Sequence, residues 1–157
     1  MSQGAHRQLP SIGWREWVSL PSLGIAAIQA KIDTGAQTSA LHASDIEIVE
    51  GEGARRLRFR VFPRRRDTKN SQLVEAPLLD QRIVRSSNGQ EELRFVVQAS
   101  LSVLGEEWPI ELGVTAREAM SFRLLIGRNA LADRFVVDPA ARFLGGRRKS
   151  LRGKERP

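Results

Sequence analysis

The 157-residue sequence contains no cysteine, so it can form neither a disulfide nor a thiolate metal site. It has no apolar run near the roughly 18 residues that a membrane-spanning helix needs. Residues 1–10 also lack the apolar segment of a secretory signal. We therefore expect a cytoplasmic protein without a membrane partner, although a mature chain stripped of its signal would look the same. The length favours one domain, and 41% hydrophobic residues suffice for one core.

Two common sets of catalytic motifs are missing as well. The histidines are His6 and His42, and no His-Glu-x-x-His sequence occurs, so the sequence does not indicate a zinc site. No glycine-rich loop ends in Gly-Lys-Ser or Gly-Lys-Thr, the pattern that cradles the phosphates of ATP. We therefore expect neither a metal nor a cofactor, and we interpret His42 as a packed or hydrogen-bonded residue.

The net charge of +7 is concentrated at the C-terminal end of the sequence. Residues 142–157 carry seven of the 25 basic side chains and one of the 18 acidic ones, so the rest of the chain is nearly neutral. We predict a flexible N-terminus over residues 1–11, one domain over 12–144, and a basic disordered tail over 145–157. The tail is either a solubilising segment or an electrostatic tether to RNA or the ribosome.

Residues 55–66 form a second basic region, which contains seven arginines and no acidic residue. Its members are Arg55, Arg56, Arg58, Arg60, Arg64, Arg65 and Arg66. The region is either the solvated face of a strand or a docking surface for an acidic protein or RNA. The sequence alone leaves both interpretations open.

Short alternating segments and frequent turns predict an all-β sandwich or barrel. Strands are expected at residues 12–20, 23–32, 45–49, 56–62, 124–126 and 135–137, while residues 39–42 fit either a strand or a helical turn. Pro77 limits residues 73–79 to an edge or short strand. Asn88-Gly89 predicts one hairpin turn and Gly105 another.

The sequence Asp33-Thr34-Gly35 follows directly after the apolar segment that begins at Ile25. It therefore places a carboxylate at the end of a strand, followed by a hydroxyl that can fix a turn. Glycine next in the sequence lets backbone or ligand approach closely, because it has no side chain. This loop is the candidate functional site.

Asp33-Thr34-Gly35-Ala36 resembles the catalytic loop of retropepsin-type aspartic proteases, and residues 124–129, Leu-Leu-Ile-Gly-Arg-Asn, resemble a later segment of those enzymes. The amino-acid sequence of residues 14–17, 31–36 and 38–43 is similar to that of a bacterial family of retropepsin-like domains labelled "ATP-dependent zinc protease". Members of that family are often found with ribosomal-protein glutamate ligases. The resemblance covers residues 12–144, and the motifs above support neither zinc nor ATP dependence.

The resemblance implies a closed six-stranded acid-protease barrel with a hairpin flap at residues 86–90. It implies a catalytic loop of Asp33, Thr34 and Gly35, with Ala36, Ser87, Asn88, Gly89 and Ile126 at the substrate. It gives Gly127, Arg128 and Asn129, together with His42, structural roles near the site. Retroviral enzymes have an acidic residue where this sequence has Gln37, so Arg128 loses its charged partner.

Aspartic proteases need two carboxylates that share a proton, and this sequence has one Asp-Thr-Gly. We therefore expect a homodimer that hydrolyses peptide bonds, with acidic, glutamate-rich protein tails as a substrate hypothesis. One alternative is a non-catalytic binding module of the same fold that holds an acidic protein or RNA. Another is a metallopeptidase, as the family label says.

Overall fold

Strands dominate the computed structural model, which describes residues 8–85, 89–116 and 121–146. A single turn of 3-10 helix, Pro21–Leu23, and one short α-helix interrupt them in the described part of the chain. In chain order the elements are β1 (Ser11–Gly13), β2 (Arg15–Leu20), β3 (Ile25–Asp33), β4 (Ser39–Val49), β5 (Arg56–Val61), β6 (Gln72–Arg85), β7 (Glu91–Val103), β8 (Glu106–Thr115), β9 (Leu124–Gly127), α1 (Arg128–Leu131) and β10 (Val136–Asp138).

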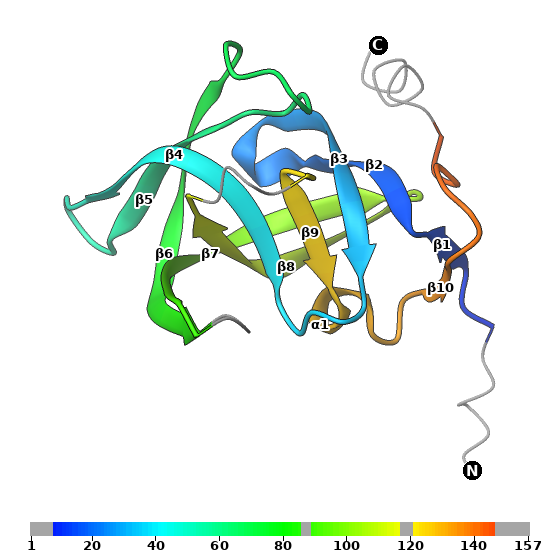
Figure 1. Ribbon diagram of the computed structural model, residues 1–157. Helices are drawn as coiled ribbons and strands as arrows, with labels where there is room; N and C mark the ends of the chain where they lie inside the picture. Colours follow the sequence, from blue (N-terminus) through cyan, green and yellow to red (C-terminus); the bar gives the residue numbers. More distant parts are fainter. Residues whose placement is uncertain (1–7, 86–88, 117–120, 147–157) are drawn as a thin grey trace.

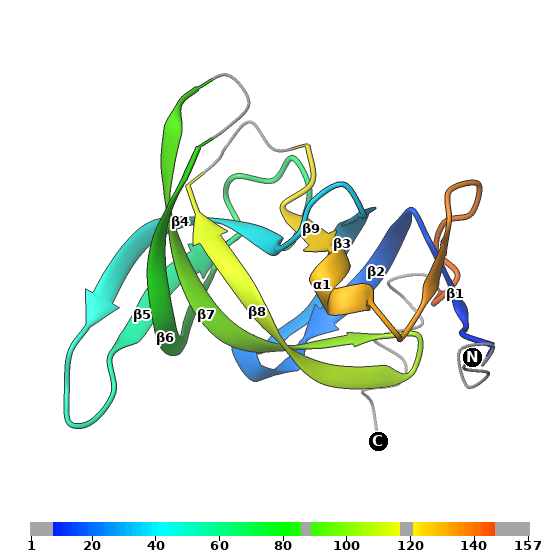
Figure 2. The same cartoon turned by 90° about the horizontal axis from the view of Figure 1, so that it is seen from below.

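The predicted all-β class is confirmed, but the expected strand count is wrong. Within the described ranges the main sheet has eight strands in the order β2-β3-β9-β4-β5-β6-β7-β8, and β1 pairs with β10 in a separate parallel sheet. Additional pairings join β2 to β7 and β4 to β8, so the main sheet curls strongly (Figures 1 and 2). The expected strand over 12–20 is therefore two strands in two sheets, divided at Trp14.

Two long strands, β4 and β6, each change partner along their length. The expected number of six strands rested on the resemblance alone. β4 pairs with β8 and β9 over residues 39–42 and with β5 from Ala43 onward, and this second pairing contains a bulge at Asp45, whose φ is 51°. β6 pairs with β5 up to Pro77 and with β7 from Leu78 onward. Pro77 is thus not in an edge strand but at the point where β6 changes partner.

The core forms where the inward faces of these strands meet. The alternation predicted for β5 is observed, because Leu57, Phe59 and Val61 are fully buried while the arginines between them are partly exposed. Trp108 is buried beside Phe135, with ring centroids 5.9 Å apart, and its indole N–H donates to the Ala130 carbonyl over 3.1 Å. This core holds β3 and β9 rigidly against the rest of the sheet.

A buried carboxylate joins the two ends of the described chain. Glu16 has no exposed surface, and its two oxygens accept hydrogen bonds from the amides of Gly13 (2.7 Å), Leu144 (3.0 Å) and Gly145 (3.0 Å). Three donors satisfy a charge that would otherwise be costly to bury. The segment after β10 is therefore fixed against β1 and β2.

The described residues include no helix that is long and apolar enough to cross a membrane.

Candidate active site

The Asp33 loop is built where two parallel strands end together. β3 and β9 pair in parallel, with Ile32 opposite Ile126 and Asp33 opposite Gly127. The connection from β3 to β4 and helix α1 therefore emerge at the same end of the sheet (Figure 1). Polar side chains at the carboxyl ends of neighbouring parallel strands lie close together, and such an edge is a common place for a functional site.

The loop folds back on the Asp33 carboxylate. Its Oδ1 accepts a hydrogen bond from the Gly35 amide over 3.1 Å, and its backbone carbonyl accepts one from Ala36 over 3.1 Å. Asp33 is partly exposed, and Thr34 and Gly35 are exposed. The hydrogen bond to Oδ1 thus restricts the orientation of the carboxylate at the surface of this chain.

Gly127 allows the segment over residues 124–129 to pack directly against the Asp33 loop. A Cβ at this position would lie 2.6 Å from both the carbonyl carbon and the oxygen of Thr38, so a side chain cannot be accommodated without moving backbone. The Gly127 amide donates to the Ser39 hydroxyl over 3.1 Å in the protein interior. This close approach locks the end of β9 to the start of β4.

Arg128 ties the loop from its other side. Its backbone amide donates to the Ala36 carbonyl over 2.9 Å, and its guanidinium donates to the Thr34 and Gly35 carbonyls over 3.2 and 3.3 Å. The Asn129 amide donates to the Gln37 carbonyl over 3.1 Å. Arg128 therefore holds the loop through neutral carbonyl acceptors, consistent with Gln37 standing where retroviral enzymes have an acidic partner.

A pocket of about 390 Å³ opens beside the loop. Residues 36–38 of the loop line one part of the pocket. The rest is lined by the arms of the β6–β7 hairpin and by β8, which contribute Arg82, Val84, Arg94, Val96, Glu111 and Gly113. The hairpin predicted as a flap thus borders the loop. Two of its tip residues, Ser87 and Asn88, lie outside the described residues, and Gly89 is exposed with a φ of 85°.

Two other predicted residues lie away from this pocket. Ile126 has no exposed surface and packs in the core, so its side chain is not accessible to a substrate in this chain. His42 is buried in β4 opposite Thr115, and its ring stacks on Phe62 with centroids 6.0 Å apart. It is a packed side chain three residues beyond Ser39, the residue that contacts the site.

The sequence did not indicate the two arginines of the pocket. Arg82 and Arg94 lie directly opposite each other in the β6–β7 hairpin. If Asn88-Gly89 formed a two-residue turn, the pairing of β6 with β7 would be shifted by one residue, and Arg82 would not lie opposite Arg94. Asp80 and Glu92 lie 2.9 and 2.8 Å from these guanidiniums, which offsets their repulsion.

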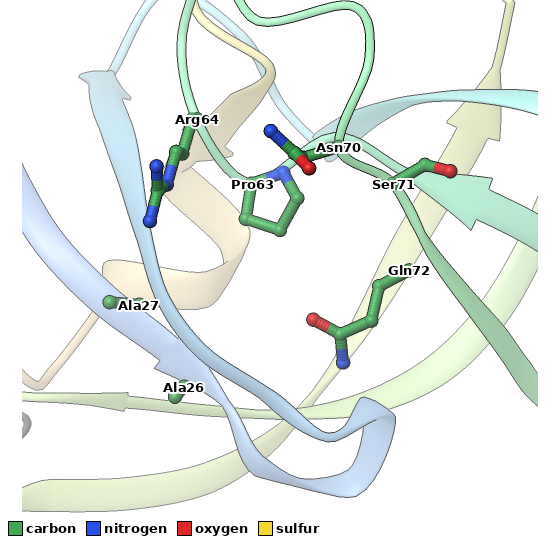
Figure 3. Close-up of a pocket in the computed structure, with 7 residues that line it drawn as sticks. All are labelled: Ala26, Ala27, Pro63, Arg64, Asn70, Ser71 and Gln72. Atoms are coloured by element: carbon green, nitrogen blue, oxygen red, sulfur yellow. The ribbon is translucent and has the colours of Figure 1, made fainter.

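A further pocket lies at the opposite end of β3, remote from Asp33. Its volume is about 340 Å³, and Figure 3 shows Ala26 and Ala27 on one side with Pro63, Arg64, Asn70, Ser71 and Gln72 opposite. The Gln72 amide is already engaged, because it donates to the Gly24 carbonyl over 2.6 Å. Within the described parts of the chain, neither pocket contains a group of three or more His, Cys, Asp or Glu residues that could hold a metal ion.

Comparison with known proteins gives a consistent assignment. A family model described as the retropepsin-like aspartic endopeptidase RimB matches residues 11–148. A "Probable alpha-L-glutamate ligase" from Desulfotalea psychrophila is 41% identical over 140 residues, covering 89% of this chain and 30% of the relative. A relative of the same name from Parasynechococcus marenigrum is 47% identical over 129 residues, covering 82% of this chain and 28% of the relative.

The chain therefore spans less than a third of the length of these curated relatives. Among solved structures, a Legionella pneumophila protein of unknown function superposes with a TM-score of 0.73 and 27% identity. That match covers 88% of this chain and 99% of the Legionella chain, so most of this chain shares its fold with the Legionella protein.

Proposed function

Because this chain belongs to the RimB-like family of retropepsin-like aspartic endopeptidases, we propose that it is an aspartic peptidase that acts as a homodimer. The main support is the loop geometry: Asp33 stands at the end of β3, with its carboxylate fixed by the Gly35 amide and its loop tied to Arg128. Such a fixed and accessible carboxylate is what this chemistry requires.

The reaction needs a second carboxylate. Each chain has one Asp-Thr-Gly sequence, so a two-fold dimer would place Asp33 opposite Asp33 of a second copy. Two carboxylates so close cannot both be ionised, and the pair shares one proton. Its titration would show two apparent pKa values that belong to the pair.

The proposed hydrolysis begins with a water molecule between the two carboxyl groups. The ionised member takes a proton from this water, whose oxygen bonds to the peptide carbonyl carbon, while the protonated member donates its proton to the carbonyl oxygen. The tetrahedral intermediate then returns a proton to the carboxylate pair, and the amide nitrogen takes one as the C–N bond breaks. The pair ends with one shared proton, as it began.

The pocket beside the loop favours an acidic peptide as substrate. Ala36 and Thr38 border the pocket on the loop side, and Arg82 and Arg94 border it on the hairpin side, together with Glu111 of β8. Arg82 lies 2.9 Å from Asp80 and 3.8 Å from Glu111, and Arg94 lies 2.8 Å from Glu92. A peptide carboxylate would therefore bind by replacing these partners. Guanidinium groups bind carboxylates through paired hydrogen bonds. The relatives named as glutamate ligases point in the same direction, because a peptidase that cleaves glutamate-rich tails would reverse the effect of such a ligase.

The direct test is Asp33→Asn with an oligoglutamate-tailed peptide as substrate. We expect cleavage to fall by about 10²–10⁴-fold, because the amide can neither accept nor share the proton. Asp45→Asn is the matched control, since Asp45 is exposed at the β4 bulge with a φ that asparagine tolerates. Light scattering should give a dimer for all three proteins. Undiminished cleavage by Asp33→Asn would refute the proposal, and cleavage lost on chelation and restored by zinc would support a metallopeptidase.

A second function is a non-catalytic module that binds an acidic protein. It is favoured by one observation: relatives with the name of a ligase contain this fold over less than a third of their length. A module would bind oligoglutamate equally well as wild type and as Asp33→Asn, and neither protein would cleave it.

A further inference from the structure

Three arginines gather around three aromatic rings near the start of β2, where Trp14 and Phe143 are partly exposed and Phe122, just before β9, is buried. The Arg15 guanidinium lies over the rings of Trp14, Phe122 and Phe143, at 5.7, 5.3 and 5.1 Å from their centroids. Arg65 lies 4.3 Å from the Phe122 ring and Arg142 lies 6.0 Å from the Phe143 ring. We call these six residues the arginine–aromatic surface.

Several backbone and side-chain hydrogen bonds fix this surface in place. The Arg15 side chain donates to the Gln29 side-chain oxygen over 2.9 Å, and its carbonyl accepts from the Phe143 amide over 2.9 Å. Arg65, in the segment between β5 and β6, donates to the Ser121 carbonyl over 3.1 Å. Four separate parts of the chain therefore converge here, and hydrogen bonds orient the guanidinium groups of Arg15 and Arg65 before any ligand binds.

The arginines of this surface have no carboxylate partner in the described part of the chain. Among the described residues, no carboxylate lies within 4 Å of Arg15, Arg65 or Arg142, although eight other arginines have such partners. Burial, followed by the charges of Arg65 and Arg142, lowers the pKa of Arg15. Lys31 lies directly opposite Arg15 in the β2–β3 pairing and adds another cation. An anionic ligand would relieve this repulsion.

The geometry points to single-stranded RNA as that ligand, and we propose that the arginine–aromatic surface binds it. Phosphates supply negative charges that guanidiniums bind well, and flat bases stack on arginine planes and aromatic rings. An acidic peptide would use the positive charge but has no flat group for the rings. The sequence after residue 146 continues with six basic residues and one acidic residue, which extends the attraction for a polyanion.

The surface is separate from the pocket proposed for the peptide. That pocket lies between the Asp33 loop and the β6–β7 hairpin, whereas the surface lies on β2, on residues just before β9 and on the segment after β10. RNA binding can therefore be tested in the Asp33→Asn variant, independently of any cleavage.

The test measures binding of a fluorescent oligouridylate of about 12 nucleotides, a length suited to one small domain, as a function of salt. We expect Arg65→Gln and Arg142→Gln each to weaken binding about three- to tenfold and to reduce the slope of log affinity against log salt by about 0.7 for each phosphate that the variant no longer binds. Arg65→Lys keeps the positive charge but removes the planar guanidinium group. It should therefore weaken binding without changing the slope of log affinity against log salt. Arg58→Gln is the matched control, because Arg58 is paired with Glu47 and Glu75.

Three results would overturn the proposal. The first is unchanged binding by Arg65→Gln and Arg142→Gln, even if removal of residues 147–157 abolishes it. The second is an equal loss with Arg58→Gln, which would reveal a general charge effect. The third is tighter binding of an oligoglutamate peptide of the same charge with the same dependence on Arg65, which would assign the surface to an acidic protein. Both glutamine variants must keep the wild-type melting temperature for the comparison to count.

Discussion

Two arginine-rich regions of this protein differ in whether carboxylates pair with their guanidinium groups. On the outer face of β5, Arg56 and Arg58 share Glu75 at 3.1 and 3.3 Å, and Arg60 lies 3.3 Å from Asp45. On the arginine–aromatic surface, Arg15 and Arg65 face rings and backbone carbonyl or amide oxygens instead. The first region is electrostatically neutralised by its neighbours in the sheet, and the second remains cationic.

The difference teaches that a run of arginines in sequence is not one surface. Arg56 and Arg65 belong to the same run, yet the first lies on a strand between β4 and β6, which supply carboxylates. The second lies after the strand ends and turns toward Phe122. The strand half of the run therefore has a solvated face that is paired with carboxylates. Arg65 of its loop half lies on the arginine–aromatic surface, and a docking role for that half stays a prediction.

The largest expected effect comes from Glu16, which holds the segment that brings Arg142 and Phe143 to the arginine–aromatic surface. Glu16→Ala would leave the buried amide of Gly13 and the partly buried amides of Leu144 and Gly145 without their acceptors, each hydrogen bond being worth about 1 kcal/mol. We expect the free energy of unfolding to fall by about 3 kcal/mol and RNA binding to weaken with it. Chemical denaturation and amide exchange at Gly13, Leu144 and Gly145 would measure both effects.

Glu16→Gln provides the graded comparison. It preserves the shape and one acceptor oxygen, so its loss of stability should be smaller than that of alanine. The amides of β5 should keep their protection in both variants, because the β4–β5–β6 ladder does not involve Glu16. Equal stability of wild type and Glu16→Ala would mean that the end segment is not anchored by this carboxylate.

A smaller effect is expected when the neutral region is made cationic. Glu75→Gln removes the carboxylate shared by Arg56 and Arg58, so Arg56 becomes available to phosphates while Arg58 keeps Glu47 at 2.7 Å. We expect oligouridylate to bind slightly more tightly, with a slope against salt steeper by about 0.7 for each additional phosphate bound. Glu107→Gln makes the same charge change at an exposed position, and among the described residues no partner is released there. Identical slopes for the two variants would show that net charge, rather than pairing, governs binding.

Much of the fold followed from local patterns, and the errors have definite physical causes. The β7–β8 turn was predicted from Gly105, and both Leu104 and Gly105 have a positive φ there. The full extent of β4 was not predicted, because residues 39–42 fitted either a strand or a helical turn and the expected strand began at Asp45. The sheet joins both segments into one strand, with Asp45 as a bulge. Long-range pairing therefore decided what the local pattern left open.

The candidate site was less predictable than the fold. The resemblance identified the Asp33 loop and the Gly127 segment, which the structure places side by side. It did not reveal Arg82 and Arg94, because their opposite positions depend on the register of the β6–β7 hairpin, and a shift of one residue would separate them. Glu16 was missed for a related reason, since a carboxylate at an inward strand position is recognisable only when its amide partners, 128 and 129 residues away along the chain, are known.

The smallest expected effect concerns pH and the loop that presents Arg65. Hydrogen bonds from the Asn70 side chain and from the Lys69 and Asn70 amides lower the pKa of Asp67 from 3.8 to about 2. Because the folded pKa is depressed, the ionised carboxylate stabilises the loop fully above about pH 4, and this contribution is lost as the pH falls toward 2. RNA binding should therefore not change between about pH 5 and 8 through this group. A carbon-13 titration of Asp67 would test the assignment: a midpoint near 3.8 would mean that the three hydrogen bonds do not persist in solution, and the fixed position of Arg65 would then lose its support.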